Sequence, residues 1–186
     1  KEIIEAISRA IKQITEESDF SSVHILLANK DDIEDFSQED FSLRTSYSFH
    51  WFNNHYLSFE NFLQDMTSRQ RKNIKKERKK IYDQGVTVSR VCGSAITLEM
   101  LETFYQFYQV TYLKRGMRGY LNFEFFKKIV DSIPETIMLV LAKNNSGEYV
   151  AGALNFFDDE KLYGRYWGCL EEYDSLQFET CYYQGS

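Results

Sequence analysis

Apolar residues in the first 57 positions follow three patterns. Isoleucines at the spacing i, i+3, i+4 and i+7 predict an amphipathic helix over residues 1–17. The apolar run Ser22–Ala28 predicts a buried strand, and the aromatic, loosely alternating segment Phe41–Phe52 predicts a second one. The acidic residues 31–40 are expected to form a short helix or a loop. These elements are too few for a full domain, so residues 1–57 are interpreted as the tail of a preceding unit.

One long helix is predicted over residues 58–85. Ser58 is expected to cap its N-terminus, and Glu60 lies in the first turn, where the helix dipole favours a carboxylate. Gly85 fits the left-handed residue that commonly follows a helix. The apolar stripe between these ends consists of Phe59, Phe62, Leu63, Met66, Ile74 and Ile81.

From residue 86 onward, strands and helices are predicted in the order β, α, α, β, β, β, α. Val86–Val91 predicts a strand, Thr97 is expected to cap a helix, and Asn122–Ile133 predicts a second helix that ends before Pro134. Phe178–Gln184 begins the last helix. Three further strands, joined by hairpin-like turns, are predicted at Ile137–Ala142, Tyr149–Phe157 and Lys161–Leu170. The order indicates an α+β fold.

The predicted long helix carries a block of positive charge. Residues 69–80 contain eight basic side chains and one acidic one, a net +7 within a chain whose formal net charge is −6. One interpretation is an anion-binding face, with Arg71, Lys72, Lys75 and Lys76 contacting a phosphate chain, tRNA or a nucleotide. The other is a basic helix neutralised by its acidic neighbours, because cations are also favoured near a helix C-terminus.

Composition narrows the class of protein. With 186 residues, 43 % hydrophobic and 16 % aromatic, the chain is long and apolar enough to fold around a sizeable core. No apolar run approaches the length of a membrane-spanning helix, so no membrane span is expected. The three cysteines form no CxxC pair, which argues against a zinc site or a disulfide framework and favours a reducing cytoplasm. No metal is expected.

Three strings in the sequence are informative in combination: Phe49–Asn53 followed by Ser58–Lys80, then Phe104–Phe126, then Leu162–Gly185. Together they resemble the Fem-like branch of the GNAT acyltransferase superfamily, which is linked to peptidoglycan biosynthesis. The resemblance implies a GNAT-like mixed sheet flanked by helices. Residues 86–186 would be the first two-thirds of one such unit and residues 1–57 the tail of another, with the basic helix 58–85 between them.

The resemblance implies a bacterial N-acyltransferase that transfers an acyl or aminoacyl group to an amine acceptor. Its donor would be acyl-CoA or aminoacyl-tRNA, and tRNA is therefore a candidate partner. Many members that use acetyl-CoA hold its pyrophosphate on a glycine-rich loop at a helix N-terminus. The equivalent segment here, Glu171–Glu179, has no glycine and four acidic residues, which argues against acetyl-CoA.

The resemblance implies an active cleft along the strand Lys161–Leu170. Arg165 is a candidate for binding a substrate anion, Tyr166 for protonating a leaving group, and Glu171 or Glu172 for accepting the amine proton. Strict alternation would place Tyr163 and Arg165 on one face of the strand and Tyr166 on the other. The alternative is an exposed ladder of tyrosine and arginine followed by acidic turn residues.

Four further residues are candidates with plainer alternatives. Glu179 and Tyr183 share a helix face and suit a second acid–base and substrate-binding pair, although Glu179 also suits the dipole of a first turn. His50 is a candidate substrate contact or a structural histidine beside Trp51. Arg118 is a candidate for binding an anionic acceptor substrate. The alternative is a positive charge that the helix dipole favours near a helix C-terminus. A nucleic-acid or tRNA-binding module without catalysis, and a scaffold that has lost its activity, remain alternatives.

Overall fold

The computed structural model describes residues 2–47 and 49–185 and divides the chain into two compact units, Lys1–Asn53 and Asn54–Ser186. The first unit contains helix α1 (Glu2–Glu17), as the isoleucine spacing predicts, and helix α2 (Lys30–Gln38), the helical alternative of the two expected for the acidic segment. Asn29 begins α2, and its side chain accepts a hydrogen bond from the backbone N–H of Asp32 at 2.9 Å.

The two strands predicted in the first unit are wrong. Neither Ser22–Ala28 nor the described part of Phe41–Phe52 is a strand. A strand needs a partner to receive its backbone hydrogen bonds, and the described residues of this unit provide none. The apolar run is also largely exposed, since Leu26 retains 79 % of its accessible surface and Leu27 has a positive φ of 61°.

The second unit is built on a four-stranded sheet with the order β1-β2-β3-β4. Its strands are β1 (Thr87–Cys92), β2 (Ile137–Lys143), β3 (Tyr149–Phe157) and β4 (Leu162–Cys169). The predicted α+β class and the meander are confirmed, and all the described strand pairs are antiparallel. β4 has no partner on its outer side among the described strands.

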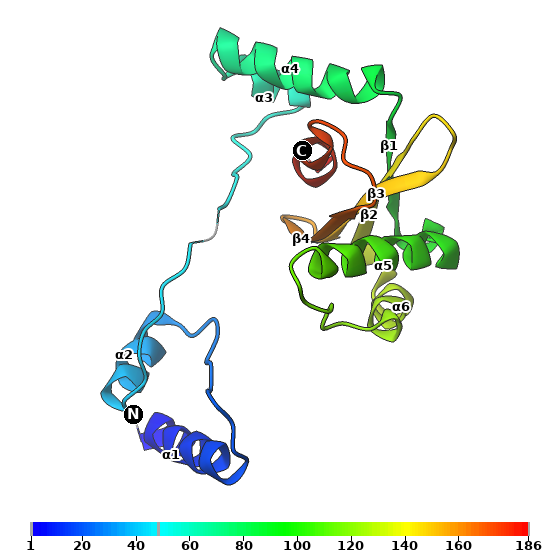
Figure 1. The fold of residues 1–186 in the computed structure, drawn as a ribbon. Coiled ribbons are helices and arrows are strands. Elements are labelled where there is room, and N and C mark those ends of the chain that lie inside the picture. The colour runs from blue at the N-terminus through cyan, green and yellow to red at the C-terminus, as the bar shows by residue number, and fades with distance from the viewer. Residues whose placement is uncertain (1, 48, 186) are drawn as a thin grey trace. The chain divides into compact units, whose positions relative to one another are not determined.

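Side chains of β2 alternate between the two faces of this sheet and are buried on both. Leu139 and Leu141 pack with helices α5 (Leu98–Leu113) and α6 (Phe123–Ser132). Ala142 packs on the opposite face with Ile81 and Leu176. Figure 1 shows α5 and α6 on one side of the sheet and the C-terminal helical turns on the other. The predicted cap Thr97 is confirmed, and Asn122 also caps its helix, since each accepts a hydrogen bond from the backbone of its helix.

The single long helix predicted over residues 58–85 is wrong. It is two helices, α3 (Phe59–Gln64) and α4 (Ser68–Asp83), because Thr67 starts a new one. Thr67 Oγ1 accepts a hydrogen bond from the backbone of Gln70 at 3.3 Å, and the Gln70 side chain accepts one from the backbone N–H of Thr67 at 3.1 Å. This reciprocal capping box satisfies two donors at the start of α4. Gly85 follows α4 with a φ of 78°, as predicted.

Short turns complete the unit. The 3₁₀ turns η1 (Gly93–Ala95) and η2 (Pro134–Thr136) flank the pair of helices α5 and α6. The last helix starts two residues earlier than predicted, as α7 (Leu176–Phe178), and continues as the π-helical turn η3 (Glu179–Tyr183).

Candidate functional site

Strand β4 contains a β-bulge at Arg165. Leu154 on β3 is opposite Tyr166, but the next residue, Asn155, is opposite Gly164, so Arg165 is an extra residue without a partner. An extra residue in one strand changes the face of the sheet on which the neighbouring side chains lie. Tyr163 therefore lies on the same face as Tyr166, and the strict alternation predicted for this strand is wrong.

Three polar groups meet beside this bulge. The hydroxyls of Tyr120 and Tyr166 are 3.0 Å apart, and Arg165 Nη2 donates to the Tyr120 oxygen at 3.2 Å. Tyr120 comes from the loop between α5 and α6 and is 62 % exposed. The bulge thus allows Arg165 and Tyr166, which alternation would separate, to meet at one exposed hydroxyl.

The hydrogen bonds make Tyr120 the more acidic of these phenols. The Tyr166 hydroxyl, followed by the Arg165 charge, lowers the pKa of Tyr120 from its ordinary value of 10.0, although burial acts in the opposite direction. The pKa of Tyr166 is raised to about 12, mainly by burial and to a smaller extent by the hydrogen bond to Tyr120. The Tyr120 and Tyr166 hydroxyls share one hydrogen bond, in which either oxygen can be the donor.

Helix α5 holds this group in place. The Tyr108 hydroxyl accepts a hydrogen bond from the backbone N–H of Leu121 at 3.0 Å, which fixes the loop next to Tyr120. The Tyr108 ring also packs edge-on against the Tyr166 ring, with centroids 5.3 Å apart. Buried aromatic packing of this kind restricts the rotamers of a site. Tyr120 was missed by the sequence analysis, although it directly follows the Arg118 and Gly119 pair in the loop.

Glu171 lies elsewhere, in a cavity at the end of β4. The cavity has a volume of about 360 Å³, and its lining includes Trp167, Cys169, Glu171 and Glu172. Trp167 and Cys169 belong to the face of the sheet that packs against Leu176, opposite the face of Tyr166. The structure does not bring Glu171 into contact with the Tyr120 group, and its role as a base stays a prediction.

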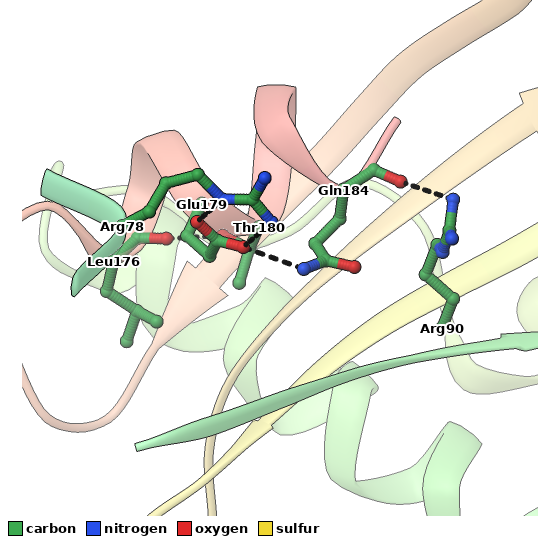
Figure 2. A network of polar contacts seen from close by, with 6 residues as sticks. All are labelled: Arg78, Arg90, Leu176, Glu179, Thr180 and Gln184. Carbon is green, nitrogen blue, oxygen red and sulfur yellow. Dashed lines mark hydrogen bonds and ion pairs between the residues drawn. The ribbon is translucent and has the colours of Figure 1, made fainter. Parts of the chain in front are cut away.

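Glu179 is buried in an ion pair. Its side chain is 1 % exposed, and Arg78 donates to both of its carboxylate oxygens, each at 3.0 Å. Gln184 Nε2 donates to the same carboxylate at 2.7 Å, and Arg90 donates to the Gln184 carbonyl at 3.0 Å (Figure 2). These bonds give each carboxylate oxygen at least one protein donor. The geometry supports a structural role for Glu179 more than the predicted catalytic one.

Tyr183 has a similar structural setting. It donates a hydrogen bond to Glu77 Oε2 at 2.6 Å, and burial raises its pKa. Arg118 is exposed in the loop two residues before Tyr120. His50 belongs to the first unit, where its ring stacks on Phe52 at a centroid distance of 6.2 Å. The substrate-binding roles of these three residues stay predictions.

The basic block on α4 divides into paired and unpaired cations. Arg71 donates to the Met66 carbonyl at 3.2 Å, and Lys75 pairs with Glu60 at 2.8 Å. Three more are ion-paired: Arg78 to Glu179, Lys79 to Asp83 and Lys80 to Asp174. Three exposed residues have no such partner within the described part of the chain: Arg69, Lys72 and Lys76. Their spacing of i, i+3 and i+7 places them on one face of the helix.

We call these three residues the cationic face of α4. Of the four predicted anion-binding residues, Lys72 belongs to this face together with Lys76. Arg71 and Lys75 are instead engaged by protein groups. The neutralised-helix interpretation therefore holds for half of the block, and anion binding by the cationic face stays a prediction.

The comparisons agree with the resemblance in the sequence. Over residues 2–47 and 49–185, no helix combines the length and apolar composition that crossing a bilayer requires. No curated protein matches the chain. A family model does match it, over residues 1–186: FemAB-like, described as peptidoglycan biosynthesis/recognition. This match covers the whole chain and indicates a role in peptidoglycan biosynthesis or recognition. The chain therefore belongs to the FemAB-like family.

Proposed function

We propose that the chain is an N-acyltransferase with a GNAT-like second unit, which moves an acyl or aminoacyl group to an amine of a peptidoglycan precursor. The observation that carries the proposal is the hydrogen-bonded group of Arg165, Tyr120 and Tyr166 at the bulge of β4. It presents a cation and a hydroxyl of lowered pKa at one exposed place. Acyl transfer needs such groups for the developing oxyanion and for the leaving group.

In the proposed step, the amine nitrogen attacks the carbonyl carbon of an ester donor. A C–N bond forms, the ester C–O bond breaks, and Arg165 stabilises the negative charge on the carbonyl oxygen. Tyr120 gives its proton to the departing oxygen, and the hydrogen bond from Tyr166 stabilises the phenolate that remains. The acceptor loses two protons from its ammonium form. One of them reprotonates Tyr120, and the other is released to solvent.

Replacing Tyr120 by phenylalanine is expected to lower the rate of transfer by about 10²–10³-fold, since a positioned general acid contributes on that order. Arg165→Gln should lower it by a similar factor through loss of oxyanion stabilisation. Only a protonated phenol can donate, so the rate should fall as pH rises through the lowered pKa of Tyr120. Single-turnover transfer from aminoacyl-tRNA to a lysine-containing precursor measures both effects.

Tyr163→Phe is the matched control, because Tyr163 is a half-exposed tyrosine on the same face of β4. Tyr163→Phe should retain the wild-type rate of transfer. In Tyr120→Phe the rate should no longer fall as the pH rises into the alkaline range. A Tyr120→Phe variant that keeps its rate and its pH profile would remove the assigned role of this hydroxyl.

The cationic face of α4 favours RNA as the carrier of the donor group. Three unpaired cations over two helical turns suit a phosphodiester backbone, and each phosphate contact releases counterions. For three contacts, log Kd should change with log salt concentration by a slope of about 2 to 3. Measuring tRNA binding to the full chain over a range of salt concentrations checks this.

The variant R69Q/K72Q/K76Q should reduce this slope nearly to zero. K127Q/K128Q/K161Q is its control, because it removes three exposed cations far from α4 in the sequence with the same change of net charge. If both variants lose tRNA affinity and salt dependence to the same extent, net charge rather than the cationic face determines RNA binding. Tight RNA binding without any transfer would favour the non-catalytic binding module instead.

A further inference from the structure

The cavity at the end of β4 has a definite electrostatic character. Of its ionisable lining groups, Glu171 and Glu172 carry negative charge, and no arginine or lysine among the described residues lines it. The remaining ionisable groups, Cys169 and Tyr173, are neutral near pH 7, since burial raises the pKa of the Cys169 thiol and a hydrogen bond to Glu171 raises that of Tyr173. Two lysines pair with carboxylates of this segment: Lys114 with Glu172 at 3.0 Å, and Lys80 with Asp174, which lies between the lining residues Tyr173 and Ser175. The cavity therefore has a net negative lining.

Both carboxylates keep one oxygen without a protein donor. Tyr173 donates to Glu171 Oε2 at 2.6 Å, and Lys114 donates to Glu172 Oε1. Within the part of the chain that the structure describes, no donor reaches Glu171 Oε1 or Glu172 Oε2. These partners orient the two groups and leave acceptor capacity for a ligand.

Aromatic walls give a second, independent indication of the ligand. Trp167 lines the cavity from β4, and Phe178, which is 52 % exposed, lines it from α7. Indole and phenyl faces attract cations through their quadrupoles, with tryptophan the most effective. A volume of about 360 Å³ is within the range of small-molecule sites.

We infer that this cavity binds the ammonium group of the acceptor substrate, with Glu171 and Glu172 receiving the charge and Trp167 and Phe178 forming the walls. A phosphate or pyrophosphate would face two carboxylates, of which only Glu172 is paired with a lysine, Lys114. These charges favour an amine over acyl-CoA at this place.

The position of the cavity suits an acceptor that spans the edge of the sheet. Cys169 follows Tyr166 by three residues, which is about 10 Å along a strand. The cavity and the Tyr120 group lie on opposite faces of the sheet, so an amine captured at the cavity has to leave it and pass around the β4 edge before its nitrogen attacks at the bulge. This role as acceptor site rests on the proposed acyl transfer, whereas binding of the ammonium group does not.

Trp167 provides a direct probe of occupancy. The chain has two tryptophans, so Trp51→Phe leaves Trp167 as the single reporter. The full-length W51F protein should show a saturable change of Trp167 fluorescence with Nα-acetyl-lysine amide. The neutral analogue, acetylated also at Nε, should give none, and inorganic pyrophosphate should not compete.

Adding E171Q/E172Q should weaken binding of Nα-acetyl-lysine amide about ten-fold, since each exposed ion pair contributes up to about 1 kcal/mol. E102Q/E160Q makes the same change of net charge at exposed glutamates outside the cavity and should leave binding unchanged. Both glutamates of the cavity are exposed, so thermal unfolding should be similar in all variants. Equal binding of the neutral analogue, competition by pyrophosphate, or unchanged affinity in E171Q/E172Q would each overturn the inference.

Activity then separates this inference from the proposed function. If the amine binds as expected but no donor yields an amide, the acyl transfer is wrong and the ammonium site stands. If transfer occurs and E171Q/E172Q leaves the KM for the amine unchanged, the ammonium site is wrong and the acyl transfer stands.

Discussion

Replacing Glu179 by alanine is expected to destabilise the second unit by about 3 kcal/mol, at the lower end of the range for breaking a buried ion pair. The carboxylate is 1 % exposed and holds Arg78 through two hydrogen bonds of 3.0 Å. Its removal leaves the guanidinium, 28 % exposed, without its charged partner, and it also removes the acceptor of Gln184. Arg90 donates to the backbone carbonyl of the same Gln184, so the loss reaches a residue that also contacts β1 (Figure 2).

Urea unfolding of the full chain, followed by far-UV circular dichroism, measures this change. Asp83→Ala is the control, because it breaks the exposed Lys79–Asp83 pair on α4, the helix that also carries Arg78. It should lower the free energy of unfolding by less than about 1 kcal/mol. The double variant R78M/E179L should recover most of the stability, since apolar side chains of similar volume often replace a buried pair without loss. A loss in Glu179→Ala no larger than that in Asp83→Ala would contradict a structural role for the pair.

Gly168→Ala is expected to cost about 2–3 kcal/mol, at the upper end for inserting a methyl group into a packed core. An added Cβ would lie 2.1 Å from the Phe107 carbonyl oxygen and 2.7 Å from Thr111 Oγ1. These atoms belong to the backbone and an inward side chain of α5, so the helix itself must move. Thr111 also donates to the Trp167 carbonyl at 2.9 Å, and this contact between α5 and β4 would be lost.

Thermal unfolding with near-UV circular dichroism checks this prediction, because Trp167 and the tyrosines report on the packing of α5. Gly164→Ala is the control on the same strand: its Cβ would meet Asn155 Oδ1 at 3.5 Å, an ordinary contact. It should change stability by less than about 0.5 kcal/mol. If the two alanine variants unfold alike, the close approach of α5 to β4 is not what requires glycine at position 168.

Elements with local signals were predicted correctly. Thr97 caps α5 as predicted, and the helix predicted from Asn122 onward forms as α6. The β2–β3–β4 meander follows from runs of apolar residues separated by turn residues. The break between α3 and α4 also has a local signal, because Thr67 and Gln70 fit the capping-box spacing, but the continuous apolar stripe masked it. The strand predicted at Ser22–Ala28 failed because a strand depends on a partner that local sequence does not supply.

The candidate site depends on contacts that no local pattern encodes. The bulge at Arg165 is a property of the register between two strands, so alternation along β4 alone predicted the wrong faces. Glu179 pairs with Arg78 from 101 positions away, and only the structure shows which basic residues of α4 are neutralised. Tyr120 contributes through a loop that folds back onto β4, 46 positions distant from Tyr166.

The bulge has a further consequence for how the chain behaves in crowded solution. The outer side of β4 is unpaired among the described strands and carries exposed Leu162 and Tyr163, a combination that invites pairing with another molecule. The extra residue at Arg165 bends this edge and places a cation on it, and both features hinder a second chain from aligning in register. Deleting Arg165 would straighten the edge and should promote β-aggregation at concentrations where the wild-type chain stays dispersed.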